Sequence, residues 1–142
     1  GGYPELHLKI ISSAEKFKKG IYNFSKLKPV HGECGGYMVM GSNIIGSDKK
    51  NYRMAGIFNL STSFEKRKLN LGYRVATIQD PFFGFKKRDI LLGHEFHYTS
   101  ILEKKDPSIV SVEDAYGNDF GLLGSRRDCA TGTFFHLIGS FE

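Results

Sequence analysis

The chain has 142 residues, of which 40% are hydrophobic and 25% charged, and its formal net charge is +5. This composition suits one globular core of ordinary size and excludes a disordered chain. The basic residues are interleaved with acidic ones, whereas a nucleic-acid site needs a concentrated basic stripe with stacking aromatics, so we expect no nucleic-acid partner. No apolar run approaches the ~20 residues of a membrane span, so we expect no membrane partner either.

The two cysteines, Cys34 and Cys129, are separated by most of the chain. They have neither a disulfide framework nor zinc-ligand spacing, which predicts no metal site and favours a reducing cytoplasm. The first residues lack both a basic signal region and an initiating methionine, so we expect the chain to begin inside a longer gene product.

The first predicted element is a helix from Pro4 to about Tyr22. Its apolar residues recur at helical spacing, and Pro4 stands where a first helical turn tolerates proline. The recurring residues are Leu6, Ile10, Ala14 and Phe17.

The most informative segment is Gly-Glu-Cys-Gly-Gly at residues 32–36. Glycines on both sides of Cys34 are typical of a nucleophile elbow, in which a strand turns sharply into a helix and exposes the central side chain. Residues 28–31 read as the strand and residues 37–40 as the helix. We expect the helix N-terminus to lower the pKa of the Cys34 thiol. The alternative is a buried structural cysteine.

The second half of the chain reads as strands. They are predicted over residues 54–60, 69–79, 89–100, 109–116 and 132–138, with a glycine-rich turn at 117–124. Alternation puts His94 on one face of its strand and Glu95 and His97 on the other, so we expect at most one of the two histidines to face a cleft. A helical first half and a strand-rich second half predict an α/β fold with mixed strands.

A thiolate nucleophile needs a proton carrier, because the leaving amine must be protonated as it departs. His136, one of five histidines, follows a short apolar strand and is far from Cys34 in sequence. Such distant pairs are normal, since catalytic residues meet through the fold. The alternative for each histidine is an ordinary hydrogen-bonded residue in the core or on the surface.

Six motifs, in order, resemble the glutamine amidotransferase domain of the cobyrinic acid a,c-diamide synthase family, and the resemblance runs end to end. Sister families that amidate cobyric acid precursors or a nickel-sirohydrochlorin share the elbow and the terminal histidine. The motifs are Gly-Gly-Tyr-Pro-Glu at 1–5, Gly-Glu-Cys-Gly-Gly-Tyr-Met at 32–38, Ser-Thr-Ser-Phe at 61–64, Leu-Gly-Tyr-Arg at 71–74, Gly-His-Glu-Phe-His-Tyr at 93–98 and Thr-Phe-Phe-His at 133–136.

The resemblance implies a class I glutamine amidotransferase-like, flavodoxin-like sheet with helices on both faces. It implies that Cys34 attacks the carboxamide of L-glutamine to form a glutamyl thioester and release ammonia, with His136 as the acid and base. The oxyanion would be bound by the amide of Gly35 and by the glycine loop at residues 1–4, with Gly2 as the expected donor.

This sequence departs from the wider class I pattern after the histidine. A proline and a glutamate that orients the imidazole are usual there, but Leu137 and Ile138 stand in their places. Glu95 is a candidate for the missing carboxylate; it could equally bind the glutamine ammonium group or brace the sheet. His97, His94 and Tyr73 are further candidates for substrate or supporting contacts.

The resemblance also implies parts that this chain lacks. The whole enzyme carries an ATP-binding domain, whereas no phosphate-binding glycine motif occurs here. We therefore expect residues 1–142 to be a partial amidotransferase domain without its first strands, which leaves a sheet edge unpaired. We expect no cofactor in this chain, ATP and Mg²⁺ in the whole enzyme, a corrinoid substrate bound through the absent domain, and a homodimer as one assembly.

The implied function is the glutaminase part of a ligase that amidates the a and c acetate side chains of cobyrinic or hydrogenobyrinic acid in cobalamin biosynthesis. Two alternatives remain open from the residues. One is a thiol hydrolase on a related flavodoxin-like sheet, and the other is a catalytically silent docking domain.

Overall fold

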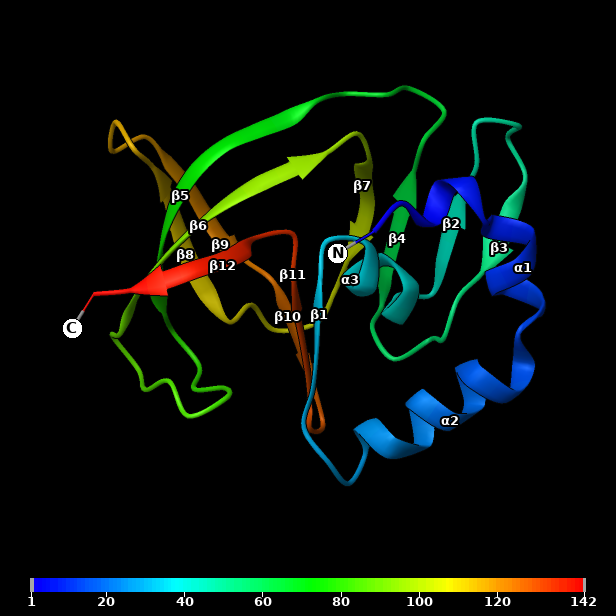
Figure 1. Cartoon of the computed structure of the whole chain (residues 1–142), viewed down its shortest axis with the longest axis horizontal. Coiled ribbons are helices and arrows are strands. Elements are labelled where there is room, and N and C mark those ends of the chain that lie inside the picture. The colour runs from blue at the N-terminus through cyan, green and yellow to red at the C-terminus, as the bar shows by residue number, and fades with distance from the viewer. Residues whose placement is uncertain (1, 142) are drawn as a thin grey trace.

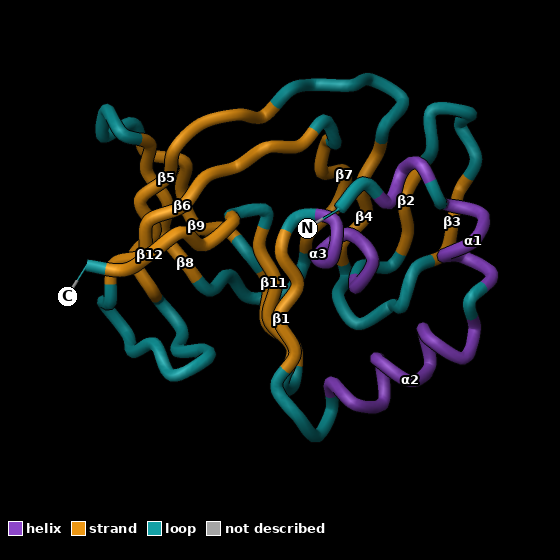
Figure 2. The backbone as a smooth tube through the Cα atoms, viewed as in Figure 1, coloured by secondary structure: helices purple, strands orange, loops and turns teal. Residues whose placement is uncertain are grey.

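The structure is a computed structural model, and it describes residues 2–141. It is a mixed α/β fold with three sheets, which confirms the expected fold class. A central three-stranded sheet lies between a four-stranded sheet on the right of Figure 1 and a five-stranded sheet on the left. The described helices gather at the end that holds the four-stranded sheet (Figure 2). None of the helices in residues 2–141 combines the length and the hydrophobicity that a bilayer crossing needs.

The predicted first helix is broken into a 3-10 turn, Pro4–Leu6, and two helices, α1 (Leu8–Ser13) and α2 (Glu15–Ser25). The break falls at Ala14, whose ψ of 63° is not helical. The expected apolar stripe does not face the core, because Ile10 and Phe17 are 69% and 51% exposed. Leu8 is buried instead, so the break changes which face of the segment packs inward.

The central sheet has the strand order β1, β11, β10. β1 (Val30–Glu33) runs parallel to β11 (Ala130–Thr133), and β10 (Ser125–Arg127) is antiparallel to β11. Within residues 2–141, β1 pairs with β11 alone and forms one edge of this sheet. The helix α3 (Gly35–Met40) follows β1 directly, which confirms the predicted strand and helix around Cys34.

The four-stranded sheet contains β3 (Asn51–Arg53), β2 (Asn43–Ile45), β4 (Leu60–Ser63) and β7 (Ser100–Lys104) in that order. The strand expected over residues 54–60 is wrong, because 54–59 form a loop. The amides of this loop bond to the last carbonyls of α3; for example, Ile57 and Phe58 N–H donate to Met40 O at 2.9 and 3.0 Å. The segment caps a helix and so cannot pair as a strand.

The five-stranded sheet is antiparallel, in the order β12 (His136–Ser140), β6 (Ile90–His97), β5 (Asn70–Ile78), β8 (Val110–Asp114), β9 (Asp119–Leu123). β5, β6 and β8 confirm three predicted strands, although β6 ends at His97. The predicted turn at 117–124 instead contains β9.

The predicted strand over residues 132–138 divides into β11 and β12, which belong to different sheets. The Thr133 hydroxyl donates to Phe135 O at 2.9 Å and bends the chain between them. β12 then pairs with β6, where Gly93 admits it, because a Cβ on Gly93 would overlap His136 O. The division places His136 at the first residue of a strand that begins beside the end of β1.

Candidate active site

Cys34 occupies a strained turn between β1 and α3. Its φ and ψ are 51° and −105°, a backbone conformation that L-residues rarely adopt and that is typical of nucleophile elbows. The turn also requires Gly32, because a Cβ there would lie 2.7 Å from both Met40 Sδ and Tyr37 N. The structure therefore has the elbow that the glycine spacing predicts.

The glycine loop packs against this elbow. A Cβ on Gly35 would lie 2.5 Å from Gly2 O and 3.0 Å from Gly2 N, so the two backbones are in close contact. Gly36, one residue further along, has nothing within 4 Å of the same position. The loop thus brings Gly2 and Gly35, the two expected oxyanion donors, side by side, while Gly1 lies outside the described residues.

The thiol of Cys34 is buried. The side chain is 5% exposed, and its Sγ donates to Phe96 O at 3.6 Å. Burial raises the pKa of the Cys34 thiol, and the Gly35 amide opposes that shift without cancelling it. The expected lowering of this pKa is therefore wrong for the closed site, because desolvation outweighs the amides of a short helix.

The cavity at Cys34 is too small for substrate in this state. Its volume is about 10 Å³, barely enough for one water molecule. The cavity as described has no room for a carboxamide beside the sulfur. The lining residues include Gly2, Tyr3, Glu5, Phe96, His97 and Tyr98.

His136 lies beside Glu33, the residue directly before the nucleophile, and is not among the residues that line the cavity at Cys34. Its Nδ1 is 3.8 Å from Glu33 Oε2, and the following amide, Leu137 N–H, donates to Glu33 Oε1 at 3.3 Å. Within residues 2–141, no hydrogen bond joins the His136 ring to Cys34. Burial lowers the pKa of His136, the neighbouring His94 lowers it further, and Glu33 opposes both effects.

His94 and His97 both lie near the site, on opposite faces of β6 as predicted. His94 is the cross-strand partner of His136, and their rings stack at 4.9 Å, whereas His97 lines the cavity at Cys34. Of the two histidines, His97 lines the cavity at Cys34 and His94 does not, so no more than one of them faces this cavity, as expected. Tyr73 is the cross-strand partner of His94 and is exposed.

Glu95 is paired within the sheet. Its Oε2 accepts from Arg74 Nε at 3.1 Å and lies 3.0 Å from Arg74 Nη2, and both side chains are buried. The Arg74 guanidinium also lies 4.3 Å from the centre of the Phe120 ring. Of the three roles considered for Glu95, bracing the sheet is the one that has a contact in the structure.

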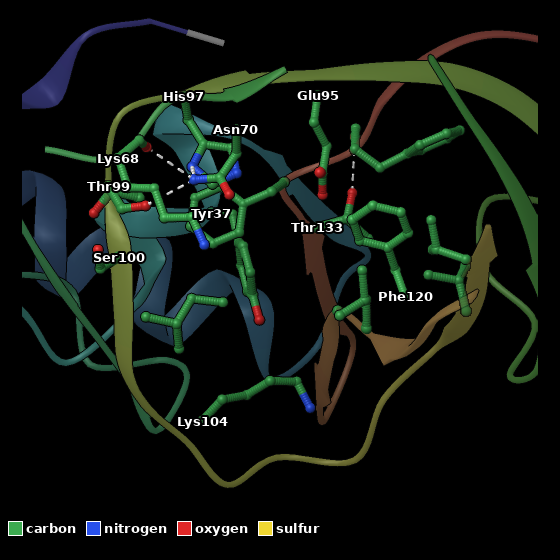
Figure 3. Close-up of a pocket in the computed structure, with 17 residues that line it drawn as sticks. Tyr37, Lys68, Asn70, Glu95, His97, Thr99, Ser100, Lys104, Phe120 and Thr133 are labelled. Atoms are coloured by element: carbon green, nitrogen blue, oxygen red, sulfur yellow. Dashed lines mark hydrogen bonds between the residues drawn. The ribbon is translucent and has the colours of Figure 1, made fainter. Parts of the chain in front are cut away.

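A larger cavity of about 350 Å³, which His97 also lines, lies between the sheets (Figure 3). His97 stacks on Phe134 at 4.1 Å, and its Nδ1 is 3.5 Å from Asn70 Nδ2. Lys104 enters the cavity from the opposite wall. Burial lowers the pKa of His97 to about 4, so this side chain is neutral near pH 7.

Glu33 is the site residue that the sequence reasoning missed. It occupies the variable position of the elbow motif, to which the motif assigns no role. A possible signal was the parallel pairing of the strands that precede Cys34 and His136, because Glu33 and Thr133 are register partners at the ends of β1 and β11. No group of three or more metal-ligating side chains occurs in the part of the chain described.

Comparison with known proteins agrees with this geometry. A family model described as "CobB/CobQ-like glutamine amidotransferase domain" matches residues 1–141. The chain is 48% identical over 138 residues to a hydrogenobyrinate a,c-diamide synthase of Rhodobacter capsulatus. It is 42% and 45% identical to proteins of that name in Mesorhizobium japonicum and Agrobacterium fabrum. Each match covers 97% of this chain but 32% of the relative, so the chain spans about a third of their length.

Proposed function

The chain belongs to the family of CobB/CobQ-like glutamine amidotransferase domains, and from this premise we propose that it hydrolyses L-glutamine to supply ammonia for an amidation carried out by a larger protein. The observation that carries the proposal is the backbone of Cys34, held at φ 51° with Gly2 pressed against Gly35. A buried structural cysteine has no need of a strained backbone or of a second glycine backbone beside it.

Cys34 is the proposed nucleophile. Once the site opens, His136 takes the thiol proton, directly or through a water, and the sulfur attacks the carboxamide carbon of glutamine. The low pKa of His136 keeps the imidazole neutral near pH 7, as a base must be. The oxygen of the tetrahedral intermediate becomes negative, and the amides of Gly35 and Gly2 are the proposed donors to it.

Collapse of the intermediate breaks the carbon–nitrogen bond. His136 returns its proton to the departing nitrogen, which leaves as ammonia, and a glutamyl thioester remains on Cys34. A water then attacks the thioester while His136 accepts a proton from it. The carbon–sulfur bond breaks, glutamate departs, and the proton returns to the sulfur.

The activity of the whole protein is a proposal that rests on its relatives. They are called hydrogenobyrinate a,c-diamide synthases, so we propose that ammonia from this domain amidates the a and c acetate groups of a hydrogenobyrinate-type corrinoid. ATP and Mg²⁺ would activate those carboxylates. We propose that this step takes place in the ATP-binding domain that the family resemblance implies for the whole protein. Two free thiols favour the cytoplasm as the proposed location.

The test is glutamine-dependent ammonia release by the full-length protein, with Cys34→Ala compared with Cys129→Ala. Cys129 lies outside the elbow and has no assigned role, so its loss controls for removal of a thiol. We expect Cys34→Ala to abolish release and Cys129→Ala to retain it. A protein that ignores glutamine but cleaves other amides or esters through Cys34 would support a thiol hydrolase instead.

A further inference from the structure

We propose that Glu33, the residue directly before the nucleophile, positions the imidazole of His136 and so takes the place of the carboxylate that is absent two residues after the histidine. This inference rests on the proposed glutaminase function. It assigns Glu33 a positioning role, because its carboxylate contacts His136 and acts on the reaction through that ring.

The two oxygens of Glu33 are aimed at two successive residues of β12. One lies 3.8 Å from Nδ1 of His136, and the other accepts the Leu137 amide at 3.3 Å. The hydrogen bond from the Leu137 amide holds the Glu33 carboxylate in place relative to the backbone of β12, and so relative to the His136 ring. The distance of 3.8 Å is longer than a hydrogen bond, and such contacts are often long before substrate binds.

The topology explains why this contact forms. β1 and β11 are parallel and in register, so Glu33 and Thr133 end their strands at the same edge of the sheet. Three residues beyond Thr133, the chain starts β12 with His136. The edge that presents Cys34 therefore also presents the carboxylate beside His136.

Other carboxylates do not compete for this role. Glu95 forms an ion pair with Arg74 inside the sheet, and the position two residues after His136 is occupied by Ile138. The titratable groups that face His136 are Glu33 from β1 and His94 from β6. His97, also on β6, is close enough to His136 for the charges of the two imidazoles to interact. Glu33 is the single acidic group in this set of described neighbours.

A carboxylate at Nδ1 has two effects on an imidazole. It selects the tautomer with the proton on Nδ1, which leaves Nε2 as the acceptor for the thiol proton. It also stabilises the imidazolium that forms when that proton arrives. Both effects predict slower chemistry without Glu33, even where the fold is intact.

The test compares Glu33→Gln, Glu33→Asp and the control Glu65→Gln in the full-length protein. Glu65 is exposed, and among the described residues its side chain forms no hydrogen bond or ion pair with Glu33, His94 or His136, so its change removes the same charge without a contact to the ring. We expect Glu33→Gln to lower kcat for glutamine hydrolysis by roughly 10- to 100-fold, within the range that acid–base catalysis contributes. KM should change little, and Glu33→Asp should recover part of kcat.

The second readout is the titration of His136 by NMR, which a merely structural role would not move. Glu33 raises the pKa of His136, so Glu33→Gln should lower the titration midpoint and shift the acidic limb of the kcat/KM profile to lower pH. Glu65→Gln should leave both unchanged. An unchanged midpoint and kcat in folded Glu33→Gln would overturn the proposal. Activity remaining in Cys34→Ala would instead overturn the proposed function.

Discussion

The imidazole rings of His94 and His136 lie stacked, with centroids 4.9 Å apart and planes 14° from parallel. They are cross-strand partners in β6 and β12, so the sheet itself fixes their separation. Two imidazoles this close resist simultaneous protonation, and His94 accordingly lowers the pKa of His136. The pair thus favours a neutral His136 near pH 7.

Replacing His94 should therefore shift the pH dependence of glutamine hydrolysis. In His94→Gln the pKa of His136 rises, because a neighbouring positive charge is lost, so the acidic limb of the kcat/KM profile should move to higher pH. This shift is opposite to the one expected for Glu33→Gln. His7→Gln, on the exposed first segment, is the matched control and should leave the profile in place. A shift to lower pH in His94→Gln would contradict the electrostatic account.

The contact between Gly2 and Gly35 predicts a large effect of one methyl group. Gly35→Ala should displace the loop, since the new Cβ would lie 2.5 Å from Gly2 O. Loss of one oxyanion donor costs on the order of a hundredfold in kcat. Gly36→Ala, with open space at the same position, should retain activity. Steady-state ammonia release measures both variants, and equal activities would mean that the loop does not support the site.

A similar pair of glycines tests how His136 is placed. Gly93→Ala should force β12 away from β6, because the added Cβ would overlap His136 O. Overpacking of this kind costs about 1–3 kcal/mol of folding free energy, which thermal unfolding detects. Gly139→Ala, on β12 with nothing within 4 Å, should leave the unfolding temperature nearly unchanged. Equal unfolding temperatures would show that the sheet accommodates the extra carbon.

The lowered pKa of His97 predicts that the folded chain loses stability in acid. Its pKa is about 4 in the folded chain, against the 6.5 of an unperturbed histidine, so the unfolded chain binds the proton more readily. The contribution of neutral His97 to the free energy of unfolding should therefore be complete above pH 6.5. It should be lost as the pH falls towards 4, by on the order of 3 kcal/mol in total. Urea unfolding of His97→Gln should show a flatter dependence in this range. The same slope in wild type and variant would assign the acid loss to other groups.

The parts of the fold that the sequence predicted are those with strong local patterns. The alternation in β5, β6 and β8 follows the period of a strand, and the glycines around Cys34 identify the elbow because few other residues suit its backbone. The first helix was misjudged because its apolar residues at positions 10 and 17 are exposed and the chain bends at Ala14. No local pattern reports such a bend.

The candidate site shows the same division. Cys34, Gly35 and His136 were identifiable from motifs, whereas the resting thiol pKa and the contact between Glu33 and His136 depend on how β1, β11 and β12 meet. Burial raised the thiol pKa where the helix alone would lower it. The neighbour of His136 came from a strand about a hundred residues away in sequence, so periodicity could not reveal it.

Trapping of the acyl-enzyme tests the central claim most directly. The full-length protein is mixed with glutamine, quenched in acid within a turnover, digested and examined by mass spectrometry. The account predicts a glutamyl adduct on the peptide that contains Cys34, absent in Cys34→Ala and absent from the peptide that contains Cys129. Glutamine hydrolysis that continues in Cys34→Ala, with no adduct on Cys34 in the wild-type protein, would contradict it.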